Sequence, residues 1–464
     1  MSNLLRESIT IWDKGSEKYF KEMNDFCQDY KSFISASKTE REAVENIVAI
    51  AEANGFIDLA EAIKTNKKLV PGDKIYATHK DKCVVLITLG AEALEQGMNI
   101  IGSHLDTPRI DLKQNPLYEE EGFAYLDTHY YGGIKNYQWV TIPLAIHGVI
   151  VTEDGKKINV TIGEDEQDPV LFITDLLPHL SKDQYDKKIK EAIEGENLNI
   201  LVGSIPVEDK EAKSRIKLNI LKLLNDKYGI TEEDFISAEL EIVPSGKARD
   251  VGFDRSMVAA YGHDDKICAY TSLRALIEAK APKKTAVALF VDKEEVGSIG
   301  STGMKSKFFM NTISELINLT EEYSSLKVNR ALANSKMLSA DVVAAFDPLY
   351  PAVHEKKNTS YLGKGIVMVK YTGNGGKGGC NDANAEFLGQ VREVFNKNKI
   401  IWQTTELGKV DQGGGGTIAY ILAEYGMDVV DCGIALLSMH APWEIASKAD
   451  IYEGYRAYNS FFSL

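Results

Sequence analysis

Two adjacent glutamates follow the end of an apolar segment, and their like charges repel each other. The segment TAVALFVD leads to Glu294 and Glu295, and glycines and serines follow at once. Repulsion and burial both raise the pKa of such carboxyl groups. The pair is therefore either part of an ordinary solvated strand end or a pair of carboxylates with different chemical roles.

Comparable polar clusters follow or lie beside other predicted strands, or open a predicted helix. The carboxyl ends of parallel strands meet at one edge of a sheet, where α/β proteins gather their functional groups. The clusters contain imidazole and carboxylate but no thiolate, a combination that suits Zn²⁺, Co²⁺ or Mn²⁺. They are His104-Leu105-Asp106, Gly262-His263-Asp264-Asp265-Lys266, Ser339-Ala340-Asp341 and Ser438-Met439-His440.

A site with two metal ions would give each glutamate a task. Two divalent ions ~3.5–4 Å apart can hold a water on one side and a carbonyl oxygen on the other. Because neighbours on a strand point to opposite faces, Glu295 can be a ligand while Glu294 faces the substrate. Glu294 then takes the proton of the attacking water and delivers it to the leaving amine. In this scheme Asp264 bridges the ions, His104 and Asp341 complete one site, and Glu295 and His440 complete the other.

The elements that must position these clusters are helices and apolar strands that alternate in both end regions of the chain. Such alternation predicts an α/β fold with a mixed, mostly parallel sheet sandwiched by helices. After a helical region over 15–65, the predicted strands are 82–90, 97–103, 285–292, 336–346 and 428–437, and the predicted helices are 265–280, 382–397 and 415–425.

The middle of the chain has a different character. From about 111 to 248 it contains aromatic and glycine-rich segments and a β-hairpin whose turn is Asp154-Gly155, followed by a helix predicted over 211–227. At 464 residues the chain is also longer than one typical core requires. We therefore predict a catalytic domain formed by residues 1–110 and 249–464, interrupted by an inserted β-rich domain of residues 111–248.

Five motifs in this order and at these separations resemble the aspartyl aminopeptidase family, metallopeptidase family 18. They read SHLDTP, GHDDK, VDKEEVGS, LSADVVAAFDP and LSMHAPWE, and the likeness covers nearly the whole chain. The resemblance implies a zinc exopeptidase-like fold and two divalent metal ions, most often Zn²⁺. It places the general base on Glu294 and, on Asp106, the carboxylate that orients the ligand histidine. The ligands that it implies are His104, Asp264, Glu295, Asp341 and His440.

The chain departs from the eukaryotic members of that family at two positions. These members tend to have Asp-Asn where this chain has Asp264-Asp265, and Asn at the position of Lys293. Both changes spare the implied ligands, and they place the chain in a bacterial-looking branch of the family.

The resemblance also gives the inserted region a role. The region resembles the family's dimerisation domain, in which the motif I-P-x-x-A-I-H supplies a histidine to the active site of the partner subunit. Here the motif ends at His147, which could alternatively be a core histidine in an alternating apolar stretch. Because the family assembles dimers into dodecamers, we expect a homo-oligomer. A preference for acidic N-terminal residues needs a cation, for which Lys370 lies in the appropriate region.

Composition excludes several other classes of protein. Hydrophobic content of 44% with 26% charged residues is ordinary for a soluble globular protein. No apolar run approaches the ~20 residues that span a bilayer, and the first 20 residues carry charges where a signal peptide is apolar. Five scattered cysteines indicate reduced thiols. A net charge of −15 argues against binding to nucleic acid. We expect a cytoplasmic protein without membrane or nucleic-acid partners.

The predicted function is that of a metal-dependent aminopeptidase that hydrolyses the N-terminal residue of peptides. One alternative is a related dinuclear carboxypeptidase or amidohydrolase. Another is a non-catalytic shell that assembles and binds cargo on an inactive peptidase fold. All five implied ligands and the general base are present in the sequence, which argues against the inactive shell.

Overall fold

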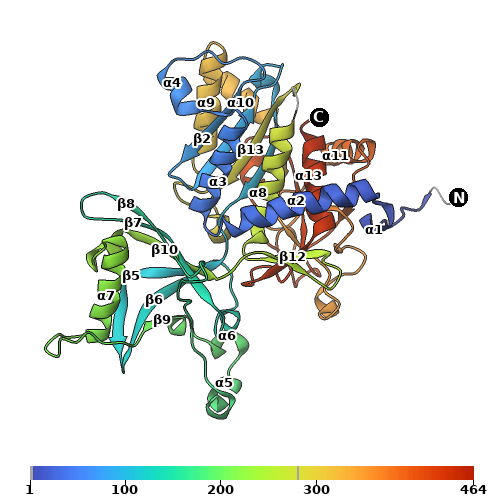
Figure 1. The fold of residues 1–464 in the computed structure, drawn as a ribbon. Helices are drawn as coiled ribbons and strands as arrows, with labels where there is room; N and C mark the ends of the chain where they lie inside the picture. Colours follow the sequence, from blue (N-terminus) through green and yellow to red (C-terminus); the bar gives the residue numbers. More distant parts are fainter. Residues whose placement is uncertain (1–3, 280–281) are drawn as a thin grey trace. The chain divides into compact units, whose positions relative to one another are not determined.

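The computed structural model describes residues 4–279 and 282–464 and divides the chain into two compact units. The first unit extends to Asp106 and resumes over Ala248–Met439 and Glu444–Leu464. The second unit comprises Thr107–Lys247 together with the short segment His440–Trp443. Figure 1 shows the helices and strands of both units with the labels used below.

Nine strands form the central sheet of the first unit, in the order β1-β2-β3-β13-β4-β14-β18-β16-β17. Five of the eight neighbouring pairs are parallel, which confirms the prediction of a mixed, mostly parallel sheet. The strands are β1 (Ile57–Asp58), β2 (Lys74–His79), β3 (Cys83–Thr88), β4 (Met98–His104), β13 (Thr285–Val291), β14 (Lys336–Ser339), β16 (Ile366–Val369), β17 (Trp402–Thr404) and β18 (Asp428–Gly433).

Both faces of this sheet are covered by helices, which explains why its central strands are apolar throughout. On β13, Ala288 and Phe290 belong to one core cluster, whereas Val287 and Leu289 belong to the other. Successive side chains of a strand point to opposite faces, so a strand buried on both sides needs an unbroken apolar run. One cluster contains residues of α2 (Glu17–Ser35), α3 (Glu40–Ala53), α8 (His263–Glu278), α11 (Ala385–Lys397) and α13 (Lys448–Phe461), and the other those of α4 (Leu59–Lys64), α9 (Phe308–Thr320), α10 (Ser325–Ala333) and α12 (Ala419–Ala423).

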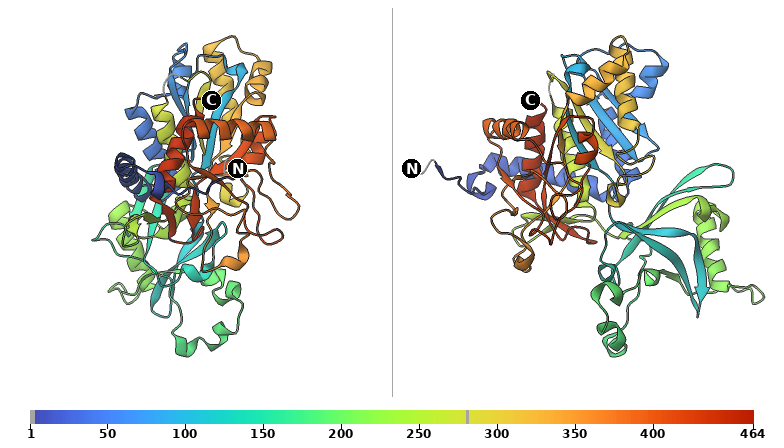
Figure 2. Two further views of the ribbon diagram at one scale, coloured as in Figure 1. Left: turned by 90° about the vertical axis from the view of Figure 1, so that its right-hand side faces the viewer. Right: turned by 180° about the vertical axis from the view of Figure 1, so that it is seen from behind.

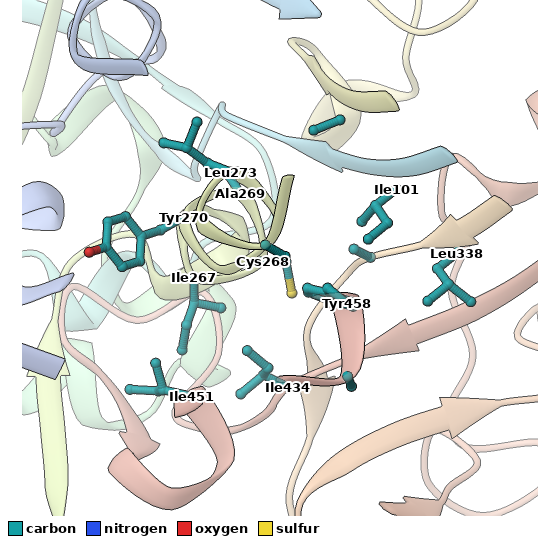
Figure 3. Packing of buried hydrophobic residues seen from close by; sticks show 14 of the residues in the cluster. Ile101, Ile267, Cys268, Ala269, Tyr270, Leu273, Leu338, Ile434, Ile451 and Tyr458 are labelled. Carbon is teal, nitrogen blue, oxygen red and sulfur yellow. The ribbon is translucent and has the colours of Figure 1, made fainter. Parts of the chain in front are cut away.

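Helix α8 belongs to the core cluster that contains Ala288 and Phe290, and it carries Asp264 near its start. Figure 3 shows its residues Ile267 and Cys268 directed toward Ile434, Ile451 and Tyr458, all of which are buried. This packing fixes the helix against α13 and the sheet. The first turn of α8 is thereby held at the edge of the sheet where the strands end.

The predicted strands 336–346 and 428–437 are each two strands in different sheets, so the prediction of single strands is wrong. The chain leaves the central sheet after β14 and β18 and enters a five-stranded sheet, in the order β11-β12-β20-β19-β15. A Cβ atom on Gly433 would lie 1.6 Å from the carbonyl oxygen of Asp341, so only glycine permits the two backbones to pass this closely. The added strands are β11 (Arg249–Val251), β12 (Met257–Ala260), β15 (Val343–Ala344), β19 (Ala435–Leu437) and β20 (Glu444–Ser447).

The second unit is built on a six-stranded antiparallel sheet, in the order β8-β7-β10-β5-β6-β9. The predicted hairpin is present between β7 and β8, and Gly155 in its turn has a φ of 81°. Helix α7 (Arg215–Tyr228) packs on β5 and β6 (Figure 2). The strands are β5 (Arg109–Glu120), β6 (Phe123–Tyr131), β7 (Leu144–Val151), β8 (Lys157–Ile162), β9 (Ile200–Gly203) and β10 (Ala238–Pro244).

The remaining helices are short: α1 (Ile11–Lys14) belongs to the first unit, and α5 (Lys182–Tyr185) and α6 (Ile189–Ala192) belong to the second. Over residues 4–279 and 282–464, no helix combines the length and the apolarity that crossing a bilayer requires.

Candidate metal centre

Five predicted site residues come together in the first unit, and we call them the His104 cluster: His104, Asp264, Glu294, Glu295 and Asp341. They fall into overlapping groups in which one ligand atom per residue lies within 4.8 Å of the others. Each member stands at or just past the end of a strand, or in the first turn of α8. The carboxyl edge of the parallel strands therefore gathers the side chains as the sequence predicted.

The imidazole of His104 is fixed by its neighbours. Its Nδ1–H donates to the carbonyl oxygen of Asp106 at 2.9 Å, and its backbone N–H donates to Asp265 Oδ2 at 3.3 Å. Its Nε2 lies 3.1 Å from Asp264 Oδ1 and 3.8 Å from Asp341 Oδ1. A hydrogen bond at Nδ1 sets the tautomer that offers Nε2 to a metal ion.

Asp106 holds the two glutamates through their backbone. Its Oδ1 accepts a hydrogen bond from the N–H of Glu294 and its Oδ2 accepts one from the N–H of Glu295, both at 3.1 Å. The same carboxylate lies 3.4 Å from His104 Nδ1. One buried side chain thus positions the histidine and both glutamates relative to one another.

The glutamates do not lie on a strand, so the prediction that strand alternation separates their roles is wrong. Strand β13 ends at Val291, Lys293 takes the left-handed conformation with a φ of 69°, and both glutamates lie in the 3₁₀ turn η7 (Glu294–Val296). This turn and the two hydrogen bonds to Asp106 fix the backbone of both glutamates.

Asp264 is held at the start of α8 by a residue that sequence reasoning missed. Its backbone N–H donates to Glu444 Oε2 at 3.0 Å, and Glu444 is fully buried on β20. Glu444 is the last residue of the motif LSMHAPWE, so the motif contained it without indicating its task. The peptide bond between Asp264 and Asp265 is cis.

The charge of the cluster fits a divalent cation. Burial raises the pKa of Glu294 to about 8, with Asp341 and Asp264 adding to the increase and His104 opposing it. Burial also raises the pKa of Asp265 well above its usual range. Burial lowers the pKa of His104, but hydrogen bonds to neighbouring carboxylates, including Asp264 and Asp341, raise it well above its usual range. An imidazole among crowded, buried carboxylates is a donor set that a dication would stabilise.

His440 belongs to the second unit, and the three groups of potential ligands found among the described residues do not include it. Its Nδ1–H donates to the carbonyl oxygen of Gly133 at 3.1 Å, and its backbone has a φ of 64°. This hydrogen bond leaves Nε2 as the nitrogen that could serve as a ligand.

His147 and Lys370 already have acidic neighbours in their own units. His147 is buried on β7, and its Nε2 lies 3.2 Å from Glu164 Oε1. Lys370 is half-exposed, and its Nζ lies 3.1 Å from Asp382 Oδ1. Any further task of either side chain must compete with these carboxylates.

His263, beside Asp264 in the sequence, has a structural role. Its Nδ1 lies 2.7 Å from the hydroxyl of Tyr30, and its Nε2–H donates to the carbonyl oxygen of Val258 at 3.1 Å. Burial lowers its pKa to about 4. Both ring nitrogens are thus engaged in holding α2, α8 and β12 together.

Known proteins resemble this chain over its whole length. A family model described as Aminopeptidase I zinc metalloprotease (M18) matches residues 33–462. A relative from Clostridium acetobutylicum, named probable M18 family aminopeptidase 1, is 58% identical over 462 residues, which cover 100% of this chain and 99% of the relative.

Solved structures share the fold. The crystal structure of an M18 family aminopeptidase from Thermotoga maritima matches with a TM-score of 0.94 at 45% identity, covering 99% of this chain and 100% of that chain. A more distant neighbour, described as the mApe1 dodecamer of S. cerevisiae, matches with a TM-score of 0.76 at 21% identity, covering 95% of this chain and 97% of that chain.

Proposed function

This chain belongs to the M18 family of aminopeptidase zinc metalloproteases, and on that basis we propose how its residues divide the work of removing the N-terminal residue of a peptide. The observation that carries the proposal is the position of Asp106. Because it binds the backbone N–H of both Glu294 and Glu295, it holds a proton carrier and a metal ligand in adjacent places.

The proposed site holds two divalent ions, most often Zn²⁺, with Co²⁺ or Mn²⁺ as alternatives. Bound ions would polarise the scissile carbonyl and make an attacking water more acidic. The burial and crowding of the carboxylates around His104 support a site of this charge. The proposed ligands are His104 and Asp341 for one ion, Glu295 and His440 for the other, and Asp264 between them.

Glu294 is the proposed general base. It is not one of the proposed ligands, and its carboxylate lies 4.0 Å from His104 Nε2, close to where the ions would bind. Burial makes its carboxylate a better proton acceptor than an exposed glutamate. It takes the proton of the attacking water and then delivers it to the amine that leaves.

His147 is proposed to act in the active site of a partner subunit, as one element of a homo-oligomer. The second unit is the proposed dimerisation domain, and a tetrahedral dodecamer of such dimers is the proposed assembly. The S. cerevisiae neighbour, which is described as a dodecamer, shares the fold of this chain, and that shared fold is what supports the expectation. In such a dimer His147 would donate a hydrogen bond to the oxyanion that forms during attack.

Lys370 is the proposed cation for acidic N-terminal side chains. An acidic side chain would have to compete with Asp382 for its ammonium group. We therefore expect a selectivity for Asp and Glu that declines as the salt concentration rises.

Aminoacyl p-nitroanilides, assayed with the metal-depleted protein and after addition of Zn²⁺, Co²⁺ or Mn²⁺, test the proposed function. We expect release of nitroaniline only after a metal ion is added, and none from N-acetylated substrates. Cleavage of the acetylated substrates, or of peptides from their carboxyl end, would contradict the assignment.

A further inference from the structure

A large cavity in the first unit is lined by basic side chains, and none of the His104 cluster is among its lining residues. Its volume is about 980 Å³, within the range of small-molecule sites. Three segments distant in sequence form its wall: residues 6–9, 356–364 and 392–404. We call it the basic cavity.

The charge of the basic cavity is opposite to that of the chain. The whole chain carries −15, yet Glu7 is the one carboxylate among the described residues that line the cavity. Over residues 4–279 and 282–464, no ion pair with a carboxylate involves any of the five cations. These cations are Arg6, Lys356, Lys357, Lys364 and Arg392.

One wall is formed by the segment before α1, which is anchored rather than loose. Arg6 donates to the carbonyl oxygen of Trp402 at 2.7 Å, and its guanidinium carbon lies 4.0 Å from the centre of the Trp402 ring. The indole Nε1–H of Trp402 in turn donates to Asn396 Oδ1 at 2.9 Å. These contacts fix Arg6 in place without a neutralising carboxylate.

Two lysines of the segment 356–364 also lie beside aromatic rings. The Nζ of Lys364 donates to Ser8 Oγ at 2.8 Å and lies 4.6 Å from the centre of the Tyr361 ring. The Nζ of Lys356 lies 5.7 Å from the centre of the Phe346 ring, which packs 5.3 Å from that of Tyr361. Aromatic faces orient a cation and leave its full charge available to a ligand.

We propose that the basic cavity binds a small anion with several linked phosphate groups, either a nucleoside triphosphate or an inorganic polyphosphate. Arginine and lysine are the side chains that bind phosphate oxygens, and arginine can do so in a bidentate way. Five cations around a cavity of about 980 Å³ exceed what a single phosphate needs. None of the residues that line the cavity is a proposed metal ligand or the proposed general base.

Calorimetric titration of the zinc-loaded protein with sodium tripolyphosphate, and separately with ATP, tests the proposal at constant ionic strength. In the variant K364E/R392E we expect Kd to rise at least about tenfold, the effect of losing charge-assisted hydrogen bonds. The matched control is K67E/K68E, which changes the net charge equally at two exposed lysines of the same unit. We expect its Kd to stay within about twofold of the wild-type value.

Both polyanions could also bind zinc, but that binding would be unchanged in all variants. The proposal is wrong if the wild-type protein binds neither polyanion, or if K364E/R392E binds them like the control. The variant K356E/K357E alters two exposed side chains and replaces K364E/R392E in the titration if that variant does not fold. Wild-type affinity of K356E/K357E for both polyanions would equally contradict the proposal. Tighter binding of ATP than of tripolyphosphate would identify a nucleotide as the ligand. Equal binding of the two would show that the phosphate chain alone is recognised.

Discussion

Replacing Asp106 with Asn should disable the site while leaving every proposed metal ligand in the chain. The carboxylate accepts hydrogen bonds from the N–H groups of Glu294 and Glu295. An asparagine can accept only one of them, and its amide NH₂ faces the other N–H. A hydrogen bond to a charged group contributes about 1.5–3 kcal/mol, which corresponds to a loss of about 10- to 100-fold in activity or metal affinity.

The assay for D106N is kcat at saturating Zn²⁺, together with zinc content and urea unfolding of the metal-free protein. The free energy of unfolding should fall by about 1–3 kcal/mol, because one buried N–H loses its partner. The control is D73N: Asp73 also accepts a backbone N–H, that of Val70 at 2.9 Å, but lies outside the cluster. Wild-type kcat and zinc affinity in D106N would refute the positioning role of Asp106.

Four further substitutions test the general base, a metal ligand, the close backbone crossing at Gly433 and the histidine proposed to act in a partner subunit. Glu294→Gln should keep its metal ions and lose about 10²–10⁴-fold in kcat, and a loss below about tenfold would contradict the role of Glu294 as general base. Glu295→Gln should instead have a lower metal content, measured by elemental analysis. Gly433→Ala should destabilise the protein by about 1–3 kcal/mol or more in urea, because its Cβ would meet the Asp341 carbonyl; unchanged stability contradicts the close crossing. His147→Ala should lower kcat by about 10²–10³-fold while the metal content stays unchanged. Verified heterodimers of His147→Ala with Glu294→Ala should regain activity, and inactive heterodimers would contradict a role of His147 in the partner's active site.

The sequence predicted which side chains come together where a single rule governs their place. His104 ends one apolar strand, Asp341 follows another and Asp264 lies in the first turn of a helix, so parallel strands with a common carboxyl edge bring them together. The short unbroken apolar runs favour strands that are buried on both faces of a sheet covered by helices.

The remaining features depend on contacts between distant segments. The separation of β14 from β15 requires Gly433 to meet the backbone of Asp341, a contact that neither local sequence contains. The turn that contains Glu294 depends on hydrogen bonds that its backbone N–H groups donate to Asp106, 188 residues from Glu294 in the sequence. The periodicity of apolar residues indicates which face of a segment is buried. It does not indicate which other segment that face will contact.

The zinc content of purified subunits, measured by elemental analysis after dialysis, tests the central claim that the His104 cluster is a dinuclear site with Asp264 shared by both ions. We expect about two zinc ions per subunit in the wild-type protein and in Glu294→Gln, and a loss of both in Asp264→Ala, because a bridging ligand serves each ion. A wild-type subunit that holds a single ion at saturation, or an Asp264→Ala subunit that retains two, would contradict the account.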